Sequence, residues 1–151
     1  MTTTTALKFL ALVLTGLALV PAGAHLFEMP HKIAMPQADY FTVQAIYRGW
    51  ALFGIAIAVA VVANFLLALR LHRDGGAARL AGAAFLLMTA TLVVFFVWAW
   101  PANEATAGWT VPTADWRDLR MQWEAAHSAN ALLTFIAFCC TALAASLPGE
   151  R

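Results

Sequence analysis

The chain has 151 residues, of which 62% are hydrophobic and only 11% are charged, and its formal net charge is +1. A typical soluble domain is about 45–50% apolar and about 25% charged, so the composition excludes an ordinary soluble protein. The net charge of +1 is far from the strongly basic composition that is typical of nucleic-acid-binding proteins, and we expect no nucleic-acid partner. A mean hydropathy of +0.75 indicates an integral membrane protein whose first partner is the lipid bilayer.

Four apolar stretches predict four membrane-spanning helices. They cover approximately residues 6–27, 50–69, 80–100 and 125–147. At about 1.5 Å of rise per residue, ~20 residues cross the ~30 Å hydrocarbon core of a bilayer. The last helix is expected to start earlier, near Thr113, because Pro112 and Asp115 are typical of a helix start. The predicted fold class is all-α: an integral membrane four-helix bundle that forms a single transmembrane domain over residues 1–151.

The first stretch allows a second interpretation, as a signal peptide. Lys8 is followed by an apolar run and by Ala22-Gly23-Ala24, which resembles an A-x-A cleavage site. Cleavage there would leave His25 as a free N-terminus able to chelate copper. We favour an uncleaved first helix, because the bundle would otherwise lose one of its four spans.

Basic residues in short loops predict the orientation in the membrane. They lie before the first span, around the turn between the second and third spans, and at the end of the chain: Lys8, Arg70, Arg73, Arg79 and Arg151. Both termini are therefore expected in the cytoplasm, and the expected location is a bacterial inner membrane. The six tryptophans lie at or beyond the opposite, outer boundary, so any functional site is expected to face outward.

Residues 36–48 resemble residues 112–124. Each segment contains a proline, an aspartate, two aromatic residues and a branched aliphatic residue at the same spacing. One interpretation is two repeated helical hairpins related by a pseudo-twofold axis, which would make Arg48 and Glu124 equivalent. The other is that Pro-x-Ala-Asp-aromatic is a favourable helix start that the chain uses twice.

Ionisable residues gather where the first and last spans approach the outer side. His25, Glu28 and His31 are three residues apart near the end of the first span. Glu124 and His127 have the same spacing on the last span, and residues three apart share one face of a helix. Because ionisable groups at membrane depth usually face a bundle interior or a functional site, we expect these residues to line a pocket.

Further polar and aromatic side chains lie at the same depth. On the last helix they form a stripe at helical spacing, on the second helix they lie near its outer end, and one follows the third span. The predicted catalytic residues of the pocket are His127, Glu124, Arg120, Arg48, Tyr47, Trp123 and Asn103.

Three interpretations of the pocket's chemistry remain open. Glu-x-x-His on bundle helices is typical of non-haem carboxylate metal sites, which favours an iron or copper ion. Its expected ligands are His25, Glu28, His31, Glu124 and His127. His25 and His127 could instead be the axial ligands of a b-type haem, although the neighbouring glutamates argue against it. In the third interpretation there is no cofactor, and the arginines and glutamates form ion pairs that hold the bundle together.

The last helix also resembles a known family. Residues 116–127 follow the pattern W-x-x-L-R-x-x-W-x-x-x-H, with Pro101-Ala-Asn103 before it, and this resembles the anthrone oxygenase-like four-helix membrane proteins. Residues 24–28 are similar to the end of the first helix in that family. The resemblance extends through most of the chain.

The resemblance implies an integral membrane fold. In the fungal polyketide members it implies insertion of oxygen into an anthrone to give an anthraquinone, generally without an added cofactor. The site residues that it implies are Arg120, Trp123 and His127, with Asn103 nearby. Asn130 stands where the oxygenases would have a basic residue.

The sequence thus predicts a membrane oxidoreductase of the oxygenase type that acts on a small hydrophobic, aromatic or quinone-like molecule from the bilayer. His127 would remove a proton and would be oriented by Glu124 or Glu28. Arg120 and Arg48 would stabilise the resulting anion. The alternative is a non-enzymatic protein that binds a metal ion, haem or a small molecule, or an accessory subunit of a membrane complex. A homo-oligomer is also left open.

Overall fold

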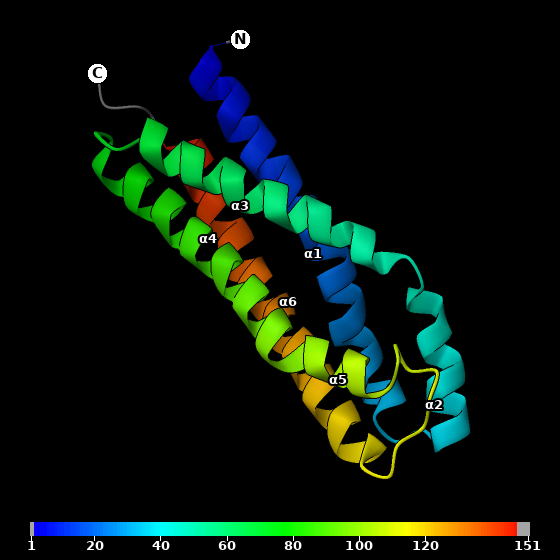
Figure 1. The fold of residues 1–151 in the computed structure, drawn as a ribbon. Coiled ribbons are helices and arrows are strands. Elements are labelled where there is room, and N and C mark those ends of the chain that lie inside the picture. The colour runs from blue at the N-terminus through cyan, green and yellow to red at the C-terminus, as the bar shows by residue number, and fades with distance from the viewer. Residues whose placement is uncertain (1, 148–151) are drawn as a thin grey trace.

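The structure is a computed structural model, and it describes residues 2–147. Within these residues the chain forms helices and no strand (Figure 1). The long helices are α1 (Thr3–Lys32), α3 (Phe53–Arg70), α4 (Gly75–Val94) and α6 (Trp116–Ser146). The shorter elements are α2 (Gln37–Gln44), α5 (Trp100–Ala105), the 3₁₀ turns η1 (Ala45–Tyr47) and η2 (Trp50–Leu52), and the π-helical turn η3 (Phe95–Ala99). The prediction of an all-α helical bundle is confirmed.

Four stretches of the described chain are long and apolar enough to cross a membrane. They are Thr3–Lys32, Trp50–Arg70, Gly75–Ala105 and Trp116–Ser146. They include nearly all of the predicted spans, and they agree with a multi-pass membrane protein. The last helix starts at Trp116, with Asp115 as its N-cap residue, slightly later than the expected start near Thr113. The first helix continues through Pro21 and Pro30 to Lys32, so its last turns project polar side chains beyond the apolar stretch.

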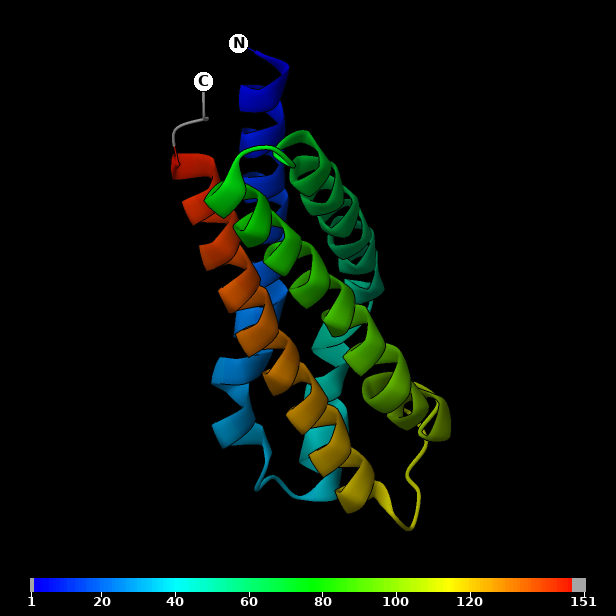
Figure 2. The same ribbon diagram turned by 90° about the vertical axis from the view of Figure 1, so that its left-hand side faces the viewer.

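The four long helices form an up-and-down bundle (Figures 1 and 2). Each long helix packs against the next along the chain, and α6 also packs against α1 to close the ring. Small residues line the interior, where they let helices approach closely: Ala11, Ala18, Ala60, Ala63, Ala81, Ala84, Ala137 and Ala144 are buried. Large apolar side chains such as Phe9, Leu86 and Leu132 point outward. This arrangement suits a bundle that is surrounded by lipid.

A polar contact ties three helices together in the middle of the bundle. Asn64 of α3 donates from Nδ2 to the Thr15 hydroxyl of α1 over 2.9 Å, and the Thr141 hydroxyl of α6 donates to Asn64 Oδ1 over 2.7 Å. All three side chains are fully buried. Because buried polar groups are costly without partners, their mutual bonding fixes the register of α1, α3 and α6.

The two ends of the bundle differ in charge. The N-terminus, the end of α6 and the turn between α3 and α4 lie together at one end (Figures 1 and 2). Arg70 closes α3 there, and Lys8 donates from Nζ to the carbonyls of Ala145 and Leu147 at the end of α6. The basic residues used to predict the orientation therefore share one end, except Arg151, which lies outside the described residues. We call the opposite end the α2–α5 end.

The two segments proposed as a repeat are only partly alike. The rings of Tyr40 and Trp116 lie 6.3 Å apart, and those of Tyr47 and Trp123 lie 5.6 Å apart, so matching aromatic residues face each other. The helices that carry them differ, because Gly49 adopts a left-handed conformation (φ 85°) that separates α2 and η1 from α3, whereas α6 is continuous.

Candidate functional site

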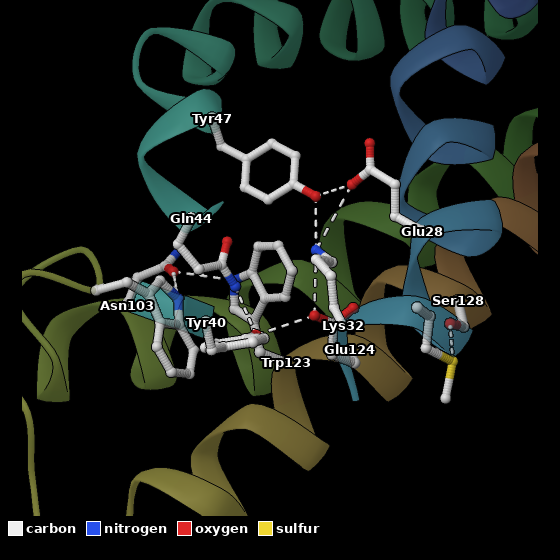
Figure 3. A network of polar contacts seen from close by, with 11 residues as sticks. Glu28, Lys32, Tyr40, Gln44, Tyr47, Asn103, Trp123, Glu124 and Ser128 are labelled. Carbon is white, nitrogen blue, oxygen red and sulfur yellow. Dashed lines mark hydrogen bonds and ion pairs between the residues drawn. The ribbon is translucent and has the colours of Figure 1, made fainter. Parts of the chain in front are cut away.

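Lys32 is the centre of a polar network at the α2–α5 end (Figure 3). Although lysine is rarely buried without a partner, this side chain is almost fully buried. Its Nζ lies 3.1 Å from Glu124 Oε1 and 3.6 Å from Glu28 Oε2, and it donates to the Tyr47 hydroxyl over 2.6 Å. The Tyr47 hydroxyl in turn donates to Glu28 Oε2. One ammonium therefore serves two carboxylates and one phenol.

The network continues from Glu124 to α2. The Tyr40 hydroxyl donates to Glu124 Oε1 over 2.9 Å, and Gln44 Nε2 donates to the Tyr40 oxygen. Glu124 is fully buried, so its charge depends on Lys32 and Tyr40 for stabilisation. Burial, together with the neighbouring Glu124 carboxylate, raises the pKa of Tyr40, and burial together with Glu28 raises the pKa of Tyr47. Both phenols therefore remain protonated donors.

Aromatic rings surround the Lys32 ammonium. Its Nζ lies 4.5 Å from the centre of the Tyr47 ring and 5.0 Å from that of Trp123. The negative faces of such rings stabilise a cation. The rings also exclude water, which strengthens the ion pairs beside them.

His25 and His127 lie next to the rings of Tyr47 and Trp123, deeper in the bundle. Their ring centres are 4.2 Å apart at an angle of 33°, and the His127 ring lies 4.1 Å from that of Trp123. His25 Nδ1 is buried without a hydrogen-bond partner. Because the two rings are in direct contact, they do not leave the space for a porphyrin that axial ligands on its opposite faces would need. The haem interpretation therefore does not fit.

The five expected metal ligands are not brought together. His31 is exposed, and the Lys32 ammonium occupies the position between Glu28 and Glu124 where a cation would have to bind. Across residues 2–147, no group of three or more His, Cys, Asp or Glu side chains is placed to hold a metal ion. The pair of carboxylates is neutralised in part by a lysine instead.

The two predicted arginines have different surroundings. Arg48 is exposed, whereas Glu124, its partner in the proposed repeat, is fully buried, so the two positions are not equivalent. Arg120 lies over the rings of Trp116 and Tyr40, and its Nη1 donates to the carbonyl of Met35 over 2.8 Å. Arg120 therefore fixes the loop between α1 and α2 rather than pairing with a carboxylate.

Asn103 orients two indoles. Its Oδ1 accepts from Trp109 Nε1 over 3.1 Å and from Trp123 Nε1 over 2.9 Å. The π-helical turn η3 directly precedes α5, which carries Asn103 and has Pro101 in its first turn. A π-helical turn adds a residue to the helix and so changes the direction of the side chains that follow it, and after this turn Asn103 Oδ1 lies within hydrogen-bond distance of Trp123 on α6. Asn103 therefore positions Trp123 against Lys32.

A groove of about 470 Å³ leads to this network between the end of α1 and α2. Its walls are mainly apolar, and its polar groups include Glu28 and Lys32. The lining residues are Ala24, Phe27, Glu28, His31, Lys32, Met35, Val43 and Ile46. The Glu28 side chain is 34% exposed and that of Lys32 is 3% exposed, so a ligand in the groove meets the carboxylate first. The arrangement can accept a proton and stabilise an anion next to an apolar surface.

The structure brings several of the predicted site residues together at the α2–α5 end, namely Glu28, Tyr47, Trp123, Glu124 and Asn103. Lys32 and Tyr40, which also belong to this network, are absent from the predicted site. Lys32 follows Glu28 by four residues and therefore lies on the same helical face. That spacing is the sequence signal for Lys32. The contact of Tyr40 with Glu124 depends on the fold-back of α2, which no local pattern specifies.

Comparisons of the chain with protein-family models, with curated proteins and with solved structures found no match. The resemblance to the anthrone oxygenase-like proteins therefore stays a prediction that rests on the residues quoted for it.

Proposed function

We propose that the protein is a membrane oxidoreductase of the oxygenase type that acts on a small hydrophobic, aromatic or quinone-like molecule from the bilayer. The observation that carries this proposal is the groove between α1 and α2, because its walls are apolar and its inner part holds Glu28 and Lys32 in contact. Small-molecule sites are typically apolar clefts with a few convergent polar groups.

Glu28 is the base of the proposed reaction, since it is the more accessible of the two carboxylates around Lys32. It removes a proton from an activated C–H group of the substrate, and Lys32 stabilises the negative charge that develops on the substrate oxygen. Dioxygen, the co-substrate, takes up the electrons and forms the new C–O bond. Loss of water from the resulting hydroperoxide leaves a carbonyl, so one CH₂ group and one O₂ give one C=O group and one water.

The other predicted residues support this site. His25, His127 and Trp123 close it toward the bundle interior through their ring contacts. Arg120 and Asn103 are positioning residues, because one holds the loop at Met35 and the other holds the Trp123 indole.

The test is oxygen consumption by the detergent-purified protein with anthrone as the probe and with the product identified by mass spectrometry. We expect consumption above the uncatalysed rate, formation of anthraquinone, and loss of both in Glu28→Gln. Glu104→Gln is the matched control, because Glu104 is an exposed glutamate at the same end of the bundle and does not line the groove. Equal oxygen consumption in the wild type and in Glu28→Gln would contradict the proposal.

A second candidate function is binding of the same kind of molecule without reaction. It is favoured by the contacts of Lys32 with Glu28, Tyr47 and Glu124, which account for the three donors of an ammonium, as in a purely structural network. Quenching of tryptophan fluorescence by anthrone without oxygen consumption would support this second candidate.

A further inference from the structure

We propose that the groove takes a hydroxyaromatic molecule in its uncharged form and binds it as the oxyanion, with the proton passed to Glu28 and the oxyanion held by Lys32 and Tyr47. This inference rests on the proposed function, because it names the substrate class of the same groove. Loss of the O–H proton from the hydroxyaromatic (enol) tautomer gives the same anion as loss of the C–H proton from the ketone, so Glu28 accepts one proton in either case.

The geometry around Glu28 supplies the acceptor and both donors. Lys32 Nζ and the Tyr47 hydroxyl both approach the same oxygen of Glu28, Oε2 (Figure 3). Lys32 lines the groove, whereas the Tyr47 hydroxyl lies behind the Glu28 carboxylate. A ligand oxygen that takes the place of Glu28 Oε2 would therefore meet the same two donors. Hydrogen bonds from an ammonium to an oxyanion are among the strong ones, so the ligand oxygen can replace the Glu28 carboxylate once that carboxylate is protonated.

The charges around Lys32 decide the form in which the ligand arrives. Glu28 and Glu124 share the Lys32 ammonium, so the group already contains more carboxylates than ammonium groups. A ligand that arrived as an anion would add another negative charge in a largely apolar groove, at a large desolvation cost. A neutral phenol adds no charge. Transfer of its proton to Glu28 breaks the ligand O–H bond, forms a carboxyl O–H bond and leaves the total charge unchanged.

Tyr47 remains a donor throughout this exchange. Burial and the Glu28 carboxylate raise the pKa of Tyr47, so its own proton is retained when a more acidic phenol enters the groove. The ligand, and not Tyr47, therefore supplies the proton that Glu28 receives.

The walls of the groove fit an aromatic ring. Phe27, Val43 and Ile46 provide apolar contacts, and the volume of about 470 Å³ falls within the range of roughly 300–1,000 Å³ typical of small-molecule pockets. A product that lacks the ionisable hydroxyl would lose its bond to Lys32. Loss of this bond would favour release of a fully oxidised product.

The test uses 4-nitrophenol as the probe, because its anion absorbs visible light and its neutral form does not. The full-length protein in detergent is mixed with the probe at a pH where the free probe is protonated. We expect the absorption of bound nitrophenolate in the wild type and its loss in Glu28→Gln and in Lys32→Gln. Glu104→Gln, which changes an exposed glutamate outside the groove, should behave as the wild type.

Two further probes test the steps separately. The ether 4-nitroanisole has no proton to give, and 4-nitrobenzenesulfonate carries a permanent charge, so both should bind at least tenfold more weakly than 4-nitrophenol. Equal binding of the ether would overturn the role of the proton, and equal binding of the sulfonate would overturn neutral uptake. Absence of the nitrophenolate absorption in the wild type would overturn the whole inference.

A variant that leaves the network intact keeps the test decisive if the Lys32 variant does not fold. Ile46 is 56% exposed and lines the groove, so Ile46→Trp should block the probe without touching Lys32. An unchanged nitrophenolate signal in Ile46→Trp would place the probe elsewhere and overturn the inference.

The two proposals can fail separately. If the nitrophenolate signal is present but no oxygen is consumed with anthrone, the proposed function fails and the inference stands. If anthrone is oxidised without any nitrophenolate signal, the inference fails and the proposed function stands.

Discussion

At the scale of single residues, Lys32 has the greatest influence on the α2–α5 end. Glu124 is fully buried and is stabilised by the Lys32 ammonium and the Tyr40 hydroxyl. Removing one member of a buried ion pair leaves an uncompensated charge, whereas replacing both members removes the charge as well. The two kinds of change should therefore have very different effects on stability.

We expect Lys32→Met to lower the free energy of unfolding by about 3–5 kcal/mol, the usual cost of breaking a buried pair. The double variant Lys32→Met/Glu124→Gln should recover part of that loss, because no buried charge is left at Glu124. Thermal unfolding in detergent of the wild type, both single variants and the double variant measures the coupling. Additive losses in the double variant would mean that Glu124 does not depend on Lys32.

The residues of the site differ in how far the sequence predicts them. Glu28, Glu124 and His127 stand out in the sequence because ionisable groups inside an apolar stretch are costly and usually face the bundle interior or a functional site. Lys32 does not, since a lysine near a helix end commonly extends its ammonium into water. Arg48, which the sequence predicts as a site residue, is exposed, because the 3₁₀ turn before it and the left-handed Gly49 after it end the helical periodicity from which its direction was inferred.

At the scale of helices and turns, the break at Gly49 lets α2 fold across the end of α1. Gly49 has φ 85°, and a Cβ atom added there would meet nothing within 4 Å. The requirement for glycine is therefore conformational and not steric. Since Tyr40, Gln44 and Tyr47 all precede this break, the positions of α2 and η1 fix three members of the Lys32 network.

Gly49→Ala should cost about 1–2 kcal/mol, the strain of a left-handed non-glycine residue, and should weaken the contacts of Tyr47. Gly54→Ala is the control, because Gly54 lies in α3 with equally open space around it and no positive φ. There we expect no loss, and a gain of at most about 1 kcal/mol. Chemical unfolding of both variants gives the comparison, and equal stability would show that the turn at Gly49 can relax.

The elements themselves follow from the sequence to different degrees. Hydropathy predicts the long helices well, because a span must be continuously apolar. It does not predict α2 as a separate helix, since Pro36 and Asp39 start a helix equally well whether or not it joins the next span. The π-helical turn η3 is also not predictable from periodicity, although it turns Asn103 toward the Trp109 and Trp123 indoles.

At the scale of the whole molecule, the up-and-down topology places the start of α1, the end of α6 and the α3–α4 turn opposite the Lys32 network (Figure 1). The basic residues at the end of the bundle with the α3–α4 turn predict that this end is cytoplasmic. The network and its groove would then face the outside of a bacterial inner membrane.

Thiol labelling in intact cells tests this orientation. In a Cys139→Ala/Cys140→Ala background, a cysteine at His72 should be protected from a membrane-impermeant reagent, and one at Thr110 should react, because both positions are exposed but lie at opposite ends. Permeabilised cells should label both positions equally, which controls for reactivity. The opposite pattern in intact cells would reverse the orientation and place the groove in the cytoplasm.

The buried contact among Thr15, Asn64 and Thr141 has a consequence for exchange with the surroundings. Between this contact and the end with the α3–α4 turn, the interior is filled by Ala11, Ala63, Leu67 and other packed side chains. This packing separates the groove at the α2–α5 end from the opposite end of the bundle. A molecule that binds in the groove therefore enters and leaves at the α2–α5 end, so an incoming molecule and an outgoing one compete for the same groove. The packed interior between the groove and the other end offers the voltage across the membrane no path along which to drive either of them through the bundle.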